Sequence, residues 1–386
     1  MSVLPIPGAE DEPLWAARLD PLLNEAAALG ASDVHLSAGQ VALMRLNGDL
    51  VPFPGPRRVL AGDWLESVLL ALLGSSKQAE FAVAGEVDLA YSLSGQRVRV
   101  NVFRQYGGIA AAMRLVPQHL PSLASLGLPE AAAALALRPH GLVLVTGPSG
   151  SGKSTTLAAM VDLLNHVKAG HIVSVEDPIE YLHQSRGCLI HQREIGTDSR
   201  SFASALRNVL RQDPDVVMIG ELRDSESIGI ALTAAETGRL VLGTLHTQGA
   251  AKSIDRIIDS FPSGQQSQVR AQLGETLKGV ISQILLPRSV GSGRVLATEV
   301  LVHTDAVANL IREGRVPQIQ TVMQTSSTLG MHTLDQSLQS LVRRGVVDRE
   351  VATKFASDQD ALAAVIVSQV PPAQANWSSA DSMKEA

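Results

Sequence analysis

The sequence is poor in cysteine and in aromatic residues. A single cysteine, Cys188, excludes an intramolecular disulfide and a cysteine-rich metal site, and it fits a reducing compartment. Aromatic residues make up only 3% of the 386 residues, whereas 45% are hydrophobic. The core must therefore consist mainly of Ala, Val, Leu and Ile, a composition that suits helices covering a parallel sheet.

Long runs of one residue type are also missing. The net charge is −6 and both signs are dispersed, so a nucleic acid or an anionic membrane is not favoured as the main partner. No apolar stretch approaches the roughly 20 residues of a membrane-spanning helix. The acidic N-terminus lacks the apolar segment of a signal peptide. We therefore expect a soluble, cytoplasmic protein that binds no nucleic acid.

A length of 386 residues is enough for two domains. The pattern predicts a small α+β domain, a linker containing Pro and Ser, and a larger α/β domain. In the latter, short apolar strands alternate with helices, which implies right-handed crossovers and a mostly parallel sheet. The expected boundaries are a flexible N-terminus over 1–12, the first domain over 13–116, the linker over 117–128, the α/β domain with C-terminal helices over 129–372, and a disordered tail over 373–386.

The pattern also predicts individual elements. Apolar residues recur at helical spacing over 202–210, and Asp198 or Ser199 is expected to cap this helix. A hairpin turn is expected at 47–49. Further helices are expected over 14–29 and 64–73, and strands over 41–46, 87–93, 97–103, 109–115, 142–145, 172–175, 216–219, 240–245 and 295–302.

The strand at 142–145 leads into the glycine-rich loop GPSGSGKST, which opens a helix. Glycines let the backbone wrap a polyphosphate, and loop N–H groups bind the anion together with the positive end of the helix. Lys153 is expected to reach the β- and γ-phosphates, and Ser154 to ligate Mg²⁺. An ordinary glycine-rich turn is the alternative. The motif predicts ATP and Mg²⁺ as ligands, bound by Gly147, Pro148, Ser149, Gly150, Ser151, Gly152, Lys153, Ser154 and Thr155.

Carboxylates follow two further strands. Glu176, Asp177 and Glu180 come after the strand at 172–175, at the sheet edge where open α/β sheets bind ligands. One of them is suited to orient or deprotonate an attacking water; a solvated acidic turn is the alternative. The segment at 215–221 resembles a Walker B strand, except that Gly220 stands where many P-loop enzymes have an aspartate. Glu221 is then the acid that holds Mg²⁺ through water or positions the nucleophilic water.

One histidine closes a predicted strand. His246 follows the strand at 240–245, where it is either a hydrogen-bonded structural residue or a sensor of the γ-phosphate. Arg223 and Asp224 are interpreted as a local ion pair. His183 lies in a polar segment and receives no role.

These pieces together resemble the type IV pilus retraction ATPases of the secretion ATPase superfamily. The resemblance covers about residues 20–355 and is more specific than the phosphate loop alone. The matching segments, in order, are GASDVHLSAG at 30–39, RVRVNVFRQ at 97–105, GPSGSGKSTT at 147–156, VEDPIEY at 175–181, DPDVVMIGELRD at 213–224, LTAAETGRLVLGTLHT at 232–247, NLIREG at 309–314 and LGMHTLDQSL at 329–338.

The resemblance implies a RecA-like P-loop ATPase domain preceded by a smaller PAS-like α+β domain. It implies a homo-hexamer, with ATP between the two domains and beside the neighbouring subunit. Lys153, Glu180, Glu221 and His246 are then the catalytic residues, with Ser154 and Glu221 at the Mg²⁺, the latter through water. Arginines of the first domain are expected to reach phosphate, because a planar guanidinium suits developing γ-phosphate charge. Their alternative is a surface ion pair, and the residues are Arg97, Arg99 and Arg114.

The implied function is an ATP-driven motor for pilus retraction and twitching motility. Its expected place is the inner face of the cytoplasmic membrane, held there by a platform protein of that membrane; a second retraction ATPase is a further candidate partner. A pilus-assembly or type II or type IV secretion ATPase stays open, as does a nucleotide-binding regulatory subunit. Two departures leave the subtype open, since Ala308 replaces an arginine of the family pattern and Arg239 a second histidine.

Overall fold

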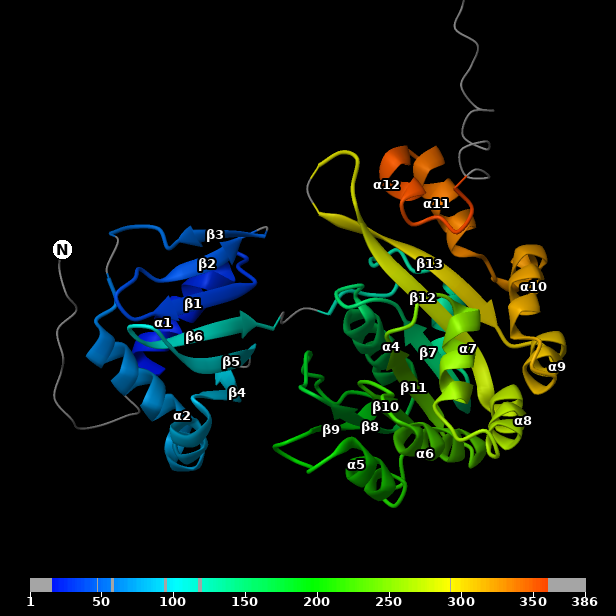
Figure 1. The fold of residues 1–386 in the computed structure, drawn as a ribbon, viewed down its shortest axis with the longest axis horizontal. Coiled ribbons are helices and arrows are strands. Elements are labelled where there is room, and N and C mark those ends of the chain that lie inside the picture. The colour runs from blue at the N-terminus through cyan, green and yellow to red at the C-terminus, as the bar shows by residue number, and fades with distance from the viewer. Residues whose placement is uncertain are drawn as a thin grey trace, which may run out of the picture.

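The computed structural model describes residues 16–359 except 47, 57–58, 94–95, 117–119 and 292. The segments predicted over 1–12 and 373–386 lie outside the described residues, as do parts of the predicted turn and linker. The described chain forms two sheets in two units that lie beside one another (Figure 1). The predicted fold class, an α/β unit preceded by a smaller α+β unit, is confirmed.

The N-terminal unit is a six-stranded antiparallel sheet with helices on one face. The strand order is β3-β2-β1-β6-β5-β4, and both helices pack against this sheet through an aliphatic core that includes Leu65, Val98 and Val100. The second helix is kinked at Gly74, which has a positive φ of 64°. The elements are α1 (Ala16–Ala28), β1 (Asp33–Ser37), β2 (Leu43–Leu46), β3 (Asp49–Pro52), α2 (Gly62–Ala84), β4 (Glu86–Leu93), β5 (Gln96–Gln105) and β6 (Gly108–Leu115).

The C-terminal unit is built on a seven-stranded sheet in the order β13-β12-β7-β11-β10-β8-β9. Every neighbouring pair is parallel except β12 and β13. The strands are β7 (Gly141–Thr146), β8 (Gly170–Glu176), β9 (Cys188–Glu194), β10 (Val216–Ile219), β11 (Leu240–Leu245), β12 (Leu277–Pro287) and β13 (Arg294–Val302).

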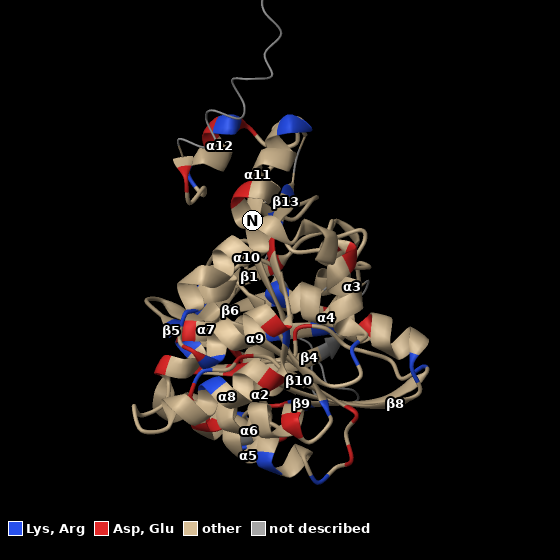
Figure 2. Ribbon diagram, turned by 90° about the vertical axis from the view of Figure 1, so that its right-hand side faces the viewer, with Lys and Arg blue, Asp and Glu red and all other residues tan. Residues whose placement is uncertain are grey.

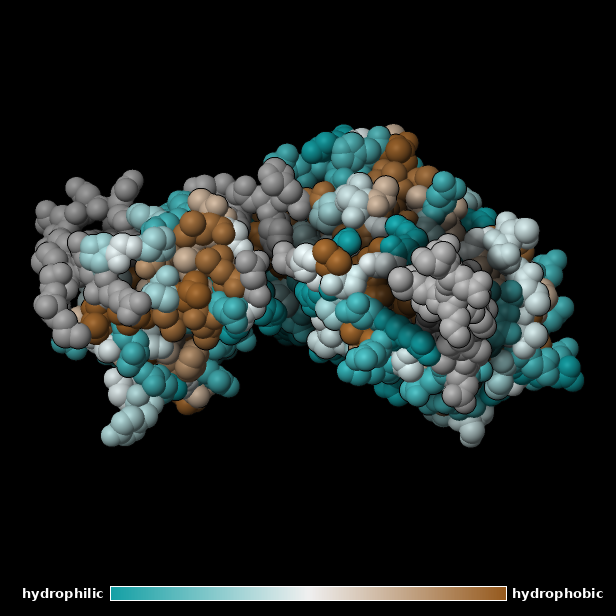
Figure 3. All heavy atoms as spheres, turned by 90° about the horizontal axis from the view of Figure 1, so that it is seen from above, coloured by the Kyte–Doolittle hydropathy of each residue, from teal (hydrophilic) through white to brown (hydrophobic). Residues whose placement is uncertain are grey.

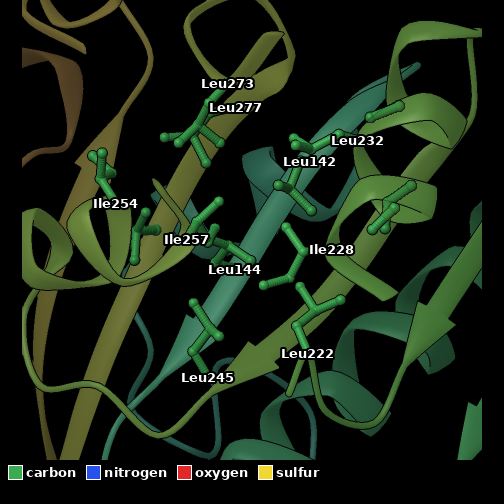
Figure 4. Close-up of a cluster of buried hydrophobic side chains, with 14 of the residues drawn as sticks. Leu142, Leu144, Leu222, Ile228, Leu232, Leu245, Ile254, Ile257, Leu273 and Leu277 are labelled. Atoms are coloured by element: carbon green, nitrogen blue, oxygen red, sulfur yellow. The ribbon is translucent and has the colours of Figure 1, made fainter. Parts of the chain in front are cut away.

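Helices cover both faces of this sheet. On one face α5 to α9 enclose a core that includes Leu144, Ile228 and Ile257 (Figure 4). On the other face α3 and α4 enclose a second core, and α11 and α12 pack on the β12–β13 hairpin. The helices are α3 (Glu130–Ala136), α4 (Lys153–Val167), α5 (Phe202–Val209), α6 (Ser225–Glu236), α7 (Ala250–Asp259), α8 (Gln266–Thr276), α9 (Asp305–Arg312), α10 (Ile319–Thr325), α11 (Leu334–Arg343) and α12 (Arg349–Thr353), with short 3₁₀ turns at Val316–Gln318 and Ser327–Leu329.

The structure departs from the sequence-based expectations in four strands and one cap. Strands β1, β3, β9 and β12 were not expected. The predicted caps of α5, Asp198 and Ser199, are wrong, because the Ser201 hydroxyl accepts from the Ser204 N–H instead. Asp198 caps the preceding turn, where its carboxylate accepts from the Glu194 N–H at 2.8 Å.

The surface is mixed in charge and carries few large apolar side chains. Acidic and basic residues are interspersed over the face that carries α5, α6 and α8 (Figure 2). Apolar side chains gather on the N-terminal unit in the view of Figure 3, and Leu50 on the edge strand β3 is 46% exposed. Within the described residues, no helix has both the length and the hydropathy required to cross a bilayer.

Candidate functional site

The carboxyl ends of four adjacent parallel strands meet at one edge of the large sheet. The strands are β7, β11, β10 and β8, and a pocket of about 460 Å³ opens at this edge. This edge is where open α/β sheets bind ligands. Of the predicted site residues, the pocket is lined by Ser149, Gly150, Gly152, Lys153, Ser154, Thr155, Glu180, Glu221, His246 and Arg114.

The glycine-rich loop joins β7 to α4 with a backbone that only glycine adopts easily. Gly147 has φ +143°, and a Cβ there would lie 2.2 Å from the backbone oxygen of Gln283. Gly152 caps α4 in the left-handed region with φ 88°. The loop backbone therefore curls tightly around the helix N-terminus, where N–H groups and the helix dipole favour an anion.

Lys153 lies inside this loop and is 8% exposed. Its ammonium donates to the carbonyls of Gly147 at 2.9 Å and Pro148 at 3.0 Å. Burial lowers the pKa of Lys153, whereas the charges of Glu221 and Glu180 act to raise it. The lysine thus sits between the loop and two carboxylates, and it can exchange its carbonyl partners for phosphate oxygens.

The end of β8 and the segment after it bring carboxylates of two kinds to the pocket. Glu176 is buried, which raises its pKa, and it accepts hydrogen bonds from Ser174 at 2.6 Å and Gln192 at 3.1 Å. Glu180 is exposed on the pocket wall, and within the described residues no hydrogen bond or ion pair engages its carboxylate. The next residue, Tyr181, ties the segment to α4, since its hydroxyl lies 2.9 Å from that of Thr155.

The structure explains why glycine replaces the usual aspartate after β10. The Gly220 N–H donates to the Val175 carbonyl at 2.8 Å, and a Cβ at Gly220 would lie 3.3 Å from the Glu176 Cα. A side chain at this position would crowd the backbone of β8. The acid at the strand end is therefore Glu221, the next residue.

Glu221 is held from two sides. One carboxylate oxygen accepts from Arg223 Nε at 2.8 Å, and the other lies 3.4 Å from His246 Nε2. The hydrogen bond with Glu221 raises the pKa of Arg223, whose guanidinium also lies 3.8 Å from Asp177. Arg223 therefore pairs with these two carboxylates. Within the described residues it makes no ion pair with Asp224, its expected partner, and the Asp224 side chain instead caps α6.

The three predicted arginines of the N-terminal unit occupy different positions. They share the face of β5 and β6 opposite the buried Val98 and Val100, and Arg99 stands beside Arg114 in the ladder. Arg114 lines the pocket and binds Asp33 at 2.9 Å. Arg97 does not line the pocket; its guanidinium pairs with Glu194 of the C-terminal unit. Arg99 is exposed and also lies outside the pocket lining.

The Arg97–Glu194 ion pair joins the two units, and its loss should destabilise the protein. Glu194 is 9% exposed on its side chain and also accepts from the Ile179 N–H at 3.0 Å. Replacing Arg97 by Ala leaves this carboxylate without its cation, which should cost up to about 3 kcal/mol of unfolding free energy in denaturant titrations. Arg99→Ala, on an exposed residue of the same strand face, should cost less than about 0.5 kcal/mol. Equal effects of the two variants would contradict a stabilising ion pair.

Sequence reasoning missed several lining residues. Arg294 reaches the pocket from the start of β13, and Tyr181 and His183 reach it from the segment after β8. Burial lowers the pKa of His183 to about 4, so its imidazole is neutral near pH 7. Tyr181 directly follows Glu180 and was detectable as part of that segment, whereas Arg294 carries no local signal because only the hairpin β12–β13 brings it to the pocket.

The pocket combines cations and anions in a way that suits a metal–polyphosphate. Its lining includes the cations Lys153, Arg114, Arg223 and Arg294, and the carboxylates Glu176, Asp177, Glu180 and Glu221. Cations and the loop N–H groups attract phosphate, while carboxylates support a divalent cation or a water. Within the described residues, no cluster of three or more His, Cys, Asp and Glu forms a protein-only metal site. A metal bound here would therefore take a hydroxyl, phosphate oxygens and water among its ligands.

The chain is similar to known proteins over most of its length. A family model described as "Type II/IV secretion system protein" matches residues 9–292. The type IV pilus retraction ATPase PilT of Pseudomonas aeruginosa is 46% identical over 87% of this chain and 97% of its own length. A twitching motility protein of Neisseria gonorrhoeae is 43% identical over 91% and 94%.

A solved structure is similar as well. The crystal structure of the pilus retraction motor PilT with bound ADP superposes with a TM-score of 0.82, at 44% identity over 88% of this chain and 97% of that chain. The chain therefore belongs to the type II/IV secretion system protein family, and within it to the ATP-hydrolysing enzymes of the PilT type.

Proposed function

We propose that this protein is a hexameric motor that hydrolyses ATP to retract type IV pili. One observation carries the proposal: a phosphate loop, two pocket glutamates and an N-terminal arginine line one pocket in a chain 46% identical to a retraction ATPase over nearly that protein's full length. We expect the protein to act at the inner face of the cytoplasmic membrane, bound to a platform protein of the pilus machine.

The phosphate loop is proposed to bind ATP through residues 147–155. Loop N–H groups and Lys153 hold the β- and γ-phosphates, after the ammonium leaves the carbonyls of Gly147 and Pro148. Ser154 and Glu221 both line the pocket. The Ser154 hydroxyl fits Mg²⁺ as a direct ligand, and the Glu221 carboxylate fits it through water. Mg²⁺, when bound, would neutralise charge that develops on the phosphates.

The attacking water is proposed to be positioned by Glu180, with Glu221 in support. The Glu180 carboxylate is exposed to the pocket and unengaged within the described residues, whereas both oxygens of Glu221 already face Arg223 or His246. His246 can report on the γ-phosphate through its contact with Glu221. Sequence alone left the two glutamates interchangeable, and these contacts favour this division of roles.

Motion is proposed to arise between the two units, with residues 117–128 as the hinge. Arg114 already lines the pocket, so closure can bring its guanidinium to the γ-phosphate, where charge develops. Arg97 and Arg99 are proposed to reach phosphate only in a rearranged assembly, because here they lie outside the pocket lining. Phosphate release would then reopen the two units.

The two departures from the family pattern lie away from the pocket. Ala308 is 3% exposed on α9, where its carbonyl packs on Gly274 of α8. Arg239 precedes β11, at the end of that strand opposite His246, and bonds the Thr237 carbonyl at 3.2 Å. Neither residue is among those lining the nucleotide pocket. They therefore leave the proposed chemistry intact.

The direction of force is tested in the native host. Lys153→Ala on the chromosome should leave cells with more surface pili and without twitching motility, because pilin is no longer withdrawn. Counting pili by electron microscopy and scoring surface motility would check this. Bald cells would show that the motor builds pili, and unchanged piliation would point to another secretion system or to a regulatory role.

A further inference from the structure

A glutamine lies buried in the middle of a largely apolar strand. Gln283 of β12 is 1% exposed and lies between Ser282 and Ile284, which are also buried. Burying an amide costs free energy unless its polar atoms find partners. A leucine or valine would fill this strand position at lower cost. The amide therefore needs a reason in its hydrogen bonds.

Both ends of the amide bond the phosphate loop and its helix. Gln283 Nε2 donates to the backbone oxygen of Ser151 at 2.7 Å, and Gln283 Oε1 accepts from Thr156 Oγ1 at 3.0 Å. In the parallel ladder of β12 and β7, Ser282 pairs with Thr146, so Gln283 stands level with the start of the loop. One side chain thus links the loop to the first turn of α4.

The loop glycines also fit against this residue. A Cβ at Gly147 would meet the backbone oxygen of Gln283 at 2.2 Å, and one at Gly152 would meet its Nε2 at 3.3 Å. The loop consequently touches Gln283 at its first glycine, near its end through Ser151, and beside its last glycine. The loop therefore packs against Gln283, although Gln283 does not line the nucleotide pocket itself.

We propose that Gln283 is a positioning residue that holds the phosphate loop in its nucleotide-binding shape. The inference rests on the proposed binding of phosphates by residues 147–155. Gln283 lies outside the pocket lining and acts through the Ser151 carbonyl and the Thr156 hydroxyl. The loop encloses the phosphates before and during reaction, so its distortion should weaken binding more than it slows turnover.

The test uses the full-length protein with Gln283→Leu, which keeps the bulk and removes both hydrogen bonds. The Kd for ADP, measured by calorimetry, and the KM for ATP, measured by phosphate release, should each rise about tenfold, as expected for buried partners left unpaired. The kcat at saturating ATP should stay within about threefold of the parent. A Kd and KM equal to those of the parent would overturn the proposal.

Thr298→Val separates positioning from simple loss of a buried hydrogen bond. Thr298 lies opposite Gln283 in the ladder with β13, is 5% exposed and bonds His332 at 2.9 Å, away from the loop. This variant should lower the Tm while leaving the Kd for ADP unchanged. A Kd raised as much as in Gln283→Leu would show that general destabilisation, not positioning, causes the effect.

Thr156→Val removes only the hydroxyl that donates a hydrogen bond to Gln283 Oε1. This variant tests the proposal if Gln283→Leu fails to fold. It should raise the Kd for ADP about threefold or more, and an unchanged Kd would overturn the proposal. In the double variant the increase should be smaller than the product of the two single effects, because both remove one link. A parent protein that binds no ADP would refute the nucleotide site itself, whereas normal parental binding with unaffected variants refutes the role of Gln283 alone.

Discussion

Lys153→Ala should reduce ATP hydrolysis by the purified protein by at least about 10²-fold, the loss typical for removal of a preorganised donor to developing charge. Lys153 is 8% exposed, and the charges of Glu221 and Glu180 act on its ammonium. Its removal takes the ammonium from the carbonyls of Gly147 and Pro148 and leaves the pocket with an excess of negative charge. ATP affinity should fall as well, because phosphate loses a charge-assisted partner. Steady-state phosphate release and ADP calorimetry measure the two effects.

Lys168→Ala is the matched control for this variant. It removes the same charge from the other end of α4, where Lys168 Nζ bonds the Arg138 carbonyl at 3.2 Å. Its turnover should equal that of the parent. Parental turnover in Lys153→Ala would contradict the assignment of this loop as the phosphate site, since Lys153 is the cation that the sequence places within residues 147–155.

Sequence reasoning placed the elements whose residues are continuously apolar. The strands expected at 216–219 and 240–245 coincide with β10 and β11, because fully buried parallel strands are aliphatic runs. Strand β12 was missed because Lys278, Ser282 and Gln283 interrupt its apolar pattern. The polar residues of the edge strand β9 hid it in the same way, since one of its sides is unpaired. Polar residues with tertiary partners are thus what single-sequence periodicity cannot predict.

The residues of the site also divide into those that the sequence motifs predict and those that they do not. Residues of different motifs, such as Lys153, Ser154 and Glu221, line the same pocket because each motif follows a strand end at one sheet edge. Arg97 was expected at phosphate, which stays a prediction. Its contact with Glu194 in this structure could not be predicted, since the placement of one unit on the other is not encoded in local spacing. Arg294 had no local signal either, because only the β12–β13 hairpin brings it to the pocket. Motif order therefore predicts the strand-end residues of a site, while contributions from other units require the structure.

Glu180→Gln should reduce kcat by about 10²- to 10⁴-fold with little change in ADP affinity, which is the range for loss of a general base. The substitution keeps the shape of the side chain and removes the carboxylate charge that orients the water or accepts its proton. Glu180 lines the pocket, and its carboxylate is unengaged within the described residues, so its lone pairs are free for water. Single-turnover hydrolysis of prebound ATP measures chemistry apart from binding and product release.

Glu221→Gln should behave differently, and the contrast tests the division of roles. Its oxygens face Arg223 Nε at 2.8 Å and His246 Nε2 at 3.4 Å, so fewer lone pairs remain for a nucleophilic water. We expect a smaller loss of kcat and a higher Mg²⁺ concentration for half-maximal activity, as for a carboxylate that supports the ion through water. Glu226→Gln, which alters an exposed carboxylate paired with Arg207 outside the pocket, should match the parent in both measurements. If Glu221→Gln abolishes single-turnover chemistry while Glu180→Gln only shifts the Mg²⁺ requirement, the two glutamates exchange roles, and the arginine contact must then orient Glu221 toward the water instead of occupying it.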